Sequence, residues 1–122
     1  MIRMWKSLLL LLAFAGGLIA QTHTVTLTWT DTVNPAGTTY DAYRLTGSCP
    51  AQPPTTTAGF TLLNTSAITA KSYADTSVIG GTTYCYVVTA VGSSGPQSAP
   101  SPDVQAIVPG AFPPQTVTAT AN

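Results

Sequence analysis

The chain has 122 residues, of which 44% are hydrophobic and only 7% are charged. This length predicts one domain with a core of modest size. The four basic and four acidic residues give a formal net charge of zero. So few cations argue against a protein that binds nucleic acid through its phosphates.

Residues 1–20 have the pattern of a secretory signal peptide. Arg3 and Lys6 precede the apolar run from Leu8 to Ala15, and Ala20 supplies a small residue for cleavage before Gln21. The stretch from Leu8 to the cleavage point has thirteen residues, whereas a membrane span needs about twenty. We therefore expect a secreted or cell-surface protein with no membrane segment in its mature form. A retained N-terminal anchor is the alternative.

Cleavage near Ala20 would also change the charge balance. Two basic residues would remain against four acidic ones, a formal charge of −2 from 2 − 4. So little charge leaves little repulsion between copies, which permits self-association. The remaining charged residues are Arg44, Lys71, Asp31, Asp41, Asp75 and Asp103.

The first predicted strand follows from alternation of apolar and polar residues. Val25, Leu27 and Trp29 alternate with threonines, which is typical of a half-buried strand. After a loop, a second strand is expected over 39–46. It is followed by an irregular segment at 47–57 that is rich in Pro and Thr.

Two short strands come next in the chain. One is expected over 60–63, where alternation does not decide whether Leu62 or Leu63 faces inward. The other is expected over 71–75, with Tyr73 as its inward residue.

The segment 81–91 predicts the central strand of a sheet. Glycines precede it, and turn residues at 92–96 end it. With a period of two, bulky residues fall on both faces, which is typical of a strand with neighbours on both sides. One face carries Tyr84, Tyr86, Val88 and Ala90, and the other Cys85, Val87, Thr89 and Val91.

The last expected strand of the domain spans 103–108, where Val104, Ala106 and Val108 alternate with other residues. Prolines at 100 and 102 keep its beginning irregular. No amphipathic helix is found after residue 20. The predicted fold class is therefore all-β.

Three segments in the expected order resemble a fibronectin type III domain. The pattern Thr83-Tyr84-x-Tyr86-x-Val88-x-Ala90-Val91 resembles strand F of that family, with Tyr84 at the position of its tyrosine corner. The segments Val25–Trp29 and Tyr40–Arg44 resemble strands B and C. The resemblance covers roughly residues 23–109 and implies a two-sheet antiparallel sandwich. It implies little about function, since this sandwich serves many unrelated roles.

The two cysteines, Cys49 and Cys85, are expected to form a disulfide. Their number is even, export would place them in an oxidising compartment, and the resemblance makes the strands that carry them neighbours. The bridge would close a loop of about 37 residues, worth roughly 3 to 4 kcal/mol in the chain-entropy model. Two inert thiols and a redox-active pair are the alternatives. The second lacks the C-x-x-C motif or helix N-terminus that would lower a thiol pKa.

The chain departs from the family at its ends. A fibronectin type III domain begins with a strand A, but the first predicted strand starts only three residues after the expected cleavage point. The tail after Phe112 resembles the absent strand. It begins with prolines, including Pro114, and continues with Val117, Ala119 and Ala121 on one face.

We therefore expect a signal peptide at 1–20, a sandwich at 21–110 and a candidate donor tail at 111–122. In this topology strand A runs parallel to the last strand, so a tail that filled the gap in its own domain would first have to cross the sandwich. Donation to a second copy needs no such return. It would give a head-to-tail filament, with Val25, Leu27 and Trp29 accepting the tail.

Two other interpretations of the tail remain. It is a flexible end or the remnant of a further domain, or it folds back on its own chain. If it is only a flexible end, the protein is instead a monomeric binding or adhesion module that recognises a glycan or a protein.

No residue pattern predicts an enzyme, a metal site or a cofactor. His23 is the only histidine, and no second ligand or base lies near it in sequence. Asp31 and Asp75 occupy positions where carboxylates accept backbone N–H groups in turns. Phosphate loops and nucleophile elbows are absent from the sequence. Asn64-Thr65-Ser66 matches the N-glycosylation sequon.

Overall fold

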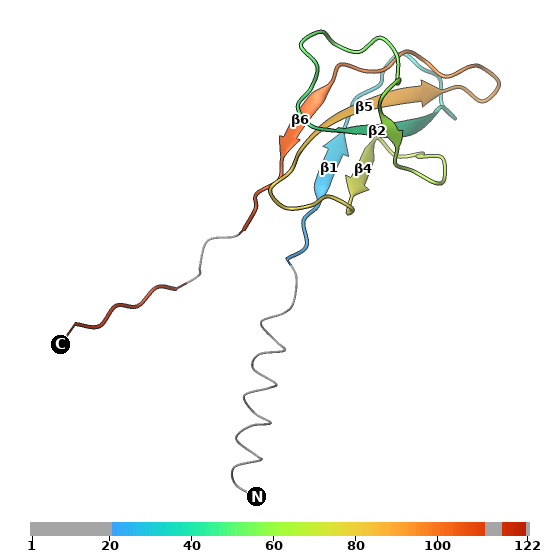
Figure 1. Ribbon diagram of the computed structural model, residues 1–122. Coiled ribbons are helices and arrows are strands. Elements are labelled where there is room, and N and C mark those ends of the chain that lie inside the picture. Colours follow the sequence, from blue (N-terminus) through green and yellow to red (C-terminus); the bar gives the residue numbers. More distant parts are fainter. Residues whose placement is uncertain (1–20, 112–115, 122) are drawn as a thin grey trace, which may run out of the picture.

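The computed structural model describes residues 21–111 and 116–121 (Figure 1). The predicted signal peptide at 1–20 and Pro114 of the predicted donor tail lie outside these ranges. The described chain is all-β, as predicted. Its strands are β1 (Val25–Thr28), β2 (Thr39–Thr46), β3 (Thr61–Leu62), β4 (Ser72–Asp75), β5 (Thr83–Val91) and β6 (Val104–Ile107).

These strands form two antiparallel sheets. One contains β1 and β4, and the other has the order β3-β2-β5-β6. The prediction that the segment around Tyr86 is a central strand is confirmed, since β5 pairs with β2 along Thr39–Thr46 and with β6 on its other side. The arrangement is consistent with a β-sandwich and compatible with a fibronectin type III or immunoglobulin-like fold.

The core lies between the two sheets. Its buried residues come from both sheets and from the loops that join them: Leu27, Tyr40, Ala42, Ile68, Val78, Tyr84, Tyr86 and Val108. Leu63 packs against this cluster, whereas Leu62 is 49% exposed. Burial therefore selects Leu63 as the inward residue, which alternation left undecided.

Val104 does not follow the alternation predicted for the last strand. Val108 is buried and Ala106 packs against the core, but Val104 is 55% exposed. The cause is local: no strand of the described chain covers this end of β6, and Val104 borders a groove instead.

The outer face of β5 is also closed. Cys85 forms the predicted disulfide with Cys49 and is fully buried. The backbone N–H of Cys49 donates a hydrogen bond to the side chain of Gln105 on β6, over 2.9 Å. Val87 and Thr89, on the same face, are buried as well. Bulk on both faces of β5 thus reflects burial on both faces.

Tyr84 makes the hydrogen bond that characterises a tyrosine corner. Its hydroxyl accepts the backbone N–H of Ile79, five residues upstream, over 3.0 Å. The ring itself is buried in the core. The loop before β5 is thereby fastened to the strand that follows it.

A buried carboxylate joins the two sheets. Asp75, at the end of β4, accepts hydrogen bonds from Arg44 on β2 (2.9 Å) and from the hydroxyl of Tyr86 on β5 (2.8 Å). The backbone N–H and the hydroxyl of Ser77 occupy its other oxygen. The guanidinium of Arg44 also lies 4.7 Å from the centre of the Tyr84 ring, a favourable cation–π contact. The predicted turn role of Asp75 is present, but it is one part of a larger network.

This network shifts two ionisation equilibria. Burial by itself would raise the pKa of Asp75, but hydrogen bonds from Ser77, Tyr86 and Arg44 outweigh it and hold that pKa below its ordinary value. Burial and the hydrogen bond to Asp75 raise the pKa of Tyr86. Asp75 therefore stabilises the fold as a carboxylate and Tyr86 as a neutral phenol.

We expect Asp75→Asn to destabilise the domain by about 3 kcal/mol at pH 7, because it leaves Arg44 partly buried without its counter-charge. A carboxylate whose pKa is lowered on folding stabilises above its unfolded pKa of about 4 and loses this contribution below it. The parent protein should therefore lose more stability than the variant between pH 7 and pH 2. Chemical denaturation at several pH values measures both effects.

Asp103→Asn is the matched control, because one oxygen of Asp103 is buried with no hydrogen-bond partner among the described residues. Its loss should not lower the stability. Equal losses of stability for the two variants at pH 7 would show that the network around Asp75 contributes nothing particular.

Candidate functional site

A groove of about 600 Å³ lies between β1 and β6, where the two sheets do not meet. β1 borders it on one side, and β6 with the segment before it borders the other. The inner face of β5 contributes to its floor. The lining residues are 25–30, 86–88, 101–102 and 104–106.

The predicted acceptor residues all line this groove. Leu27 is buried, whereas Val25 and Trp29 are partly exposed and pack against the core. Sequence reasoning missed the opposite wall, made by Val104 and Ala106 on β6. The alternation of these two residues was visible, but nothing in the sequence placed them across from β1.

The edge of β1 that borders the groove carries unpaired strand positions. The backbone N–H of Trp29 donates to the carbonyl of Lys71 over 3.1 Å, continuing the β1–β4 ladder. Because paired residues alternate along an antiparallel strand, the backbone groups of Val25 and Leu27 face β4. Those of Thr26 and Thr28 face the other way, toward the groove.

The same reasoning applies to β6. The N–H of Val108 donates to the carbonyl of Thr82 over 2.9 Å, so Val104 and Ala106 pair with β5. The backbone groups of Gln105 and Ile107 face away from β5. The groove therefore has an apolar floor and, on each side, a strand edge with hydrogen-bonding capacity.

Trp29, which lines the groove, has an unsatisfied polar atom. Its indole Nε1 is buried and has no hydrogen-bond partner in the described part of the chain. The ring packs edge-on against Tyr40, with centroids 5.3 Å apart. A buried N–H without an acceptor costs about 1–3 kcal/mol.

A second hollow of about 300 Å³ continues from Trp29 toward Asp31 and Asn34. The carboxylate of Asp31 in this hollow already accepts four hydrogen bonds. They come from the backbone N–H groups of Val33 and Asn34, the side-chain amide of Asn34 and the hydroxyl of Tyr40. These hydrogen bonds, chiefly those from Asn34, hold the pKa of Asp31 well below its usual range. Asp31 thus organises its loop, as predicted for a turn carboxylate, and little of it remains for a glycan.

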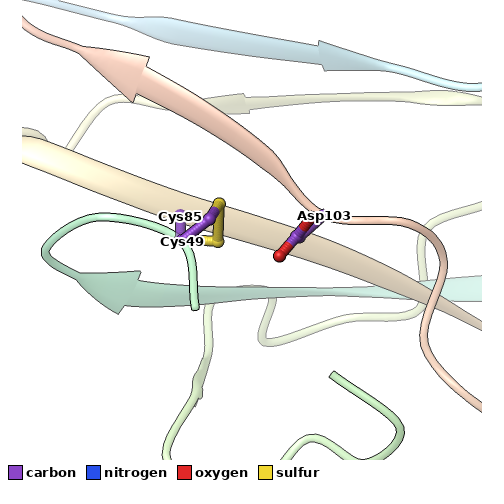
Figure 2. A group of neighbouring side chains, drawn as sticks. All are labelled: Cys49, Cys85 and Asp103. Atoms are coloured by element: carbon purple, nitrogen blue, oxygen red, sulfur yellow. A yellow bond between two sulfur atoms is a disulfide. The ribbon is translucent and has the colours of Figure 1, made fainter. Parts of the chain in front are cut away.

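Cys49, Cys85 and Asp103 form a cluster that has the composition of a metal site. Their potential ligand atoms lie within 4.8 Å of one another, and Figure 2 shows Asp103 beside the two sulfurs. The sulfurs are joined in the disulfide, so they lack the thiolate charge that binds metal ions. We assign this cluster a structural role.

The donor residues that the structure describes, Val117, Ala119 and Ala121, are not in the groove of their own chain. Residues 116–121, which include Ala119 and Ala121, are all exposed, and Val117 is 82% exposed. Figure 1 shows this segment extending away from the two sheets. The structure therefore does not bring these three donor residues and the acceptor residues together within one copy.

Comparison with models of known protein families gives no match, and no curated protein matches the sequence. Within 21–111 and 116–121, no helix has the length and hydropathy that crossing a membrane requires. A function must therefore be inferred from the residues of this chain.

The predicted glycosylation sequon is part of the fold. The side-chain oxygen of Asn64 accepts the backbone N–H of Ala42 over 2.9 Å. Its Nδ2 donates to Asp41 over 2.8 Å and to the carbonyl of Ser66 over 3.0 Å. An N-linked glycan would replace one of these two N–H groups. Asn64 therefore fastens the segment after β3 to β2.

We expect Asn64→Ala to destabilise the domain by about 1–3 kcal/mol, because it leaves the N–H of Ala42 without its acceptor. Ser66→Ala is the control: it destroys the sequon but keeps the backbone carbonyl that Asn64 uses, so stability should be unchanged. Thermal and chemical denaturation of protein made in bacteria distinguish the two. A neutral Asn64→Ala would disprove the structural role.

Proposed function

We propose that this protein is a non-enzymatic, exported subunit of an extracellular filament or surface assembly. In this proposal the domain is a fibronectin type III-like sandwich without its strand A, and the tail of one copy fills the vacant position in the next. The observation that carries the proposal is the groove between β1 and β6. It combines an apolar floor with strand edges on both sides, which is what an added strand requires.

The tail has the composition that this groove favours. Residues 116–121 alternate Thr with Val or Ala, so one face is apolar and small while the other is polar. β1 has the same alternation, with threonines between Val25, Leu27 and Trp29. Six extended residues span about 20 Å, the length of the groove wall from residue 25 to residue 30.

The exit point of the tail favours a second copy. The chain after β6 passes close to Gly80 and the N-terminal segment: a Cβ on Gly80 would lie 3.0 Å from Nε2 of His23 and from the carbonyl of Pro109. Figure 1 shows both ends of the domain leaving at this pole, where β1 begins. A strand A starts at the opposite pole. To occupy that position in its own domain, the tail would first have to cross the domain.

Donation from each copy to the next does not close on itself, so its product is an open filament. The groove also explains why a lone copy should associate, since it leaves strand edges and apolar surface uncovered. The disulfide is compatible with an extracellular location. The few charges of the chain leave little repulsion to oppose assembly.

The experiment compares the size of the protein from Gln21 to Asn122 with that of a version ending at Gly110. We expect polymers from the longer protein and monomers from the shorter one, by light scattering and negative-stain microscopy. A synthetic peptide of residues 113–122 should raise the melting temperature of the shorter protein, because it completes the sheet.

Single substitutions test whether the polymers depend on the apolar face of the tail and not only on its presence. Val117→Asp should abolish the polymers, because it places a charge against the floor of the groove. Thr118→Asp places its side chain on the outside and should leave the polymers intact.

Well-folded monomers of equal stability for the long and short proteins would overturn the proposal and favour a monomeric binding module. Dilution to nanomolar concentration tests folding back within one chain, because a cis-filled groove gives tail-dependent stability without polymers.

A further inference from the structure

We propose that the donated tail lies antiparallel to β1 in one register, in which Val117 faces Trp29, Ala119 faces Leu27 and Ala121 faces Val25. This inference rests on the proposed strand donation and specifies its geometry. Residues 116–121 then oppose residues 30–25 one by one. Thr118 pairs with Thr28 and Thr120 with Thr26.

The phase of the pairing follows from side-chain orientation. Directly opposed residues in an antiparallel pair point to the same face of the sheet. On β1, Leu27 faces the core while Thr26 and Thr28 are exposed. The apolar face of the tail must therefore oppose Leu27 and its neighbours, and a slip by one residue would turn every Val and Ala outward. Only slips by two residues keep the pattern.

The prolines disfavour a slip that moves the tail by two residues toward Val25. It would place Pro114 opposite Thr30, whose backbone faces the groove edge, and Pro has no N–H for the ladder. It would also turn the polar side chain of Gln115 toward Trp29. In the proposed register these residues fall beyond Thr30, outside the paired segment.

A slip of two residues toward Asp31 would leave apolar surface of β1 uncovered. Val117 would move past Trp29 to face Asp31, and no tail residue that is apolar would cover Val25. The proposed register is the one in which all three apolar tail residues meet all three apolar residues of the acceptor strand.

Four double-cysteine variants of the protein from Gln21 to Asn122 test the register. The substituted positions are exposed threonines, at 26 or 28 on the acceptor strand and at 118 or 120 on the tail. Residues directly opposed in a hydrogen-bonded pair have Cα atoms about 5.5 Å apart, within the range of a disulfide. Diagonal neighbours are about 7–8 Å apart. The native disulfide is protected, since Cys85 is fully buried.

We expect Thr26→Cys with Thr120→Cys, and Thr28→Cys with Thr118→Cys, to give covalent ladders on non-reducing gels that collapse to monomer on reduction. Thr26→Cys with Thr118→Cys, and Thr28→Cys with Thr120→Cys, are the matched controls and should give none. Single-cysteine variants give at most dimers.

The pattern of cross-links separates the possible failures. Ladders from both control pairs would show a tail parallel to β1, and a ladder from one control pair alone would show a slip of two residues. Either result overturns the register but leaves strand donation standing. Polymers that depend on the tail but give no ladder from any pair would place it elsewhere than on β1. Absence of polymers in all variants and in the parent protein would overturn strand donation itself.

Discussion

A strand that borders an apolar surface must satisfy its backbone N–H and C=O groups on both edges, and β1 does so on only one within the described chain. Its pairing with β4 engages the backbone of alternate residues. The other edge, with Thr26 and Thr28, faces the groove. The two-stranded sheet is thus too narrow to cover the four-stranded sheet that lies opposite it. The exposure of Val104 and the unsatisfied indole of Trp29 are both found beside this gap.

The remaining sides of the domain are closed by polar and covalent links. Asp75 bridges β4 to β2 and β5 through Arg44 and Tyr86. The disulfide holds the segment after β2 on the outer face of β5. Small domains often need such supplements because their cores are limited. Two residues of these links, Tyr86 and Gln105, also line the groove. The links therefore hold its walls within one copy.

In our proposal, the protein is a subunit that assembles after it folds. The links within the domain hold the acceptor walls in place, while the tail carries its apolar face on an exposed segment. The chain exit at Pro109 and Gly110 lies beside Gly80 and the N-terminal segment. In our proposal, the surface that one copy leaves uncovered is the surface that the next copy completes.

The sequence alone determined those features that depend on neighbouring residues. The strand expected over 39–46 after a loop is β2, with the same bounds. The bulk on both faces of 81–91 predicted a central strand, which is β5. Two cysteines in a chain with a signal-peptide pattern left one pairing, and the prediction of Cys49 with Cys85 is confirmed.

Tertiary structure decided what depends on contacts between distant segments. Alternation could not choose between Leu62 and Leu63, because the choice depends on which one meets the core. It grouped Val104 with Ala106 and Val108, but Val104 is exposed because no described strand covers that position. Asn64 had the pattern of a glycosylation site, yet its amide is engaged by β2 and the segment after β3. Local patterns report the two faces of a strand, whereas only the assembled sheets show which strand edges are left without a partner.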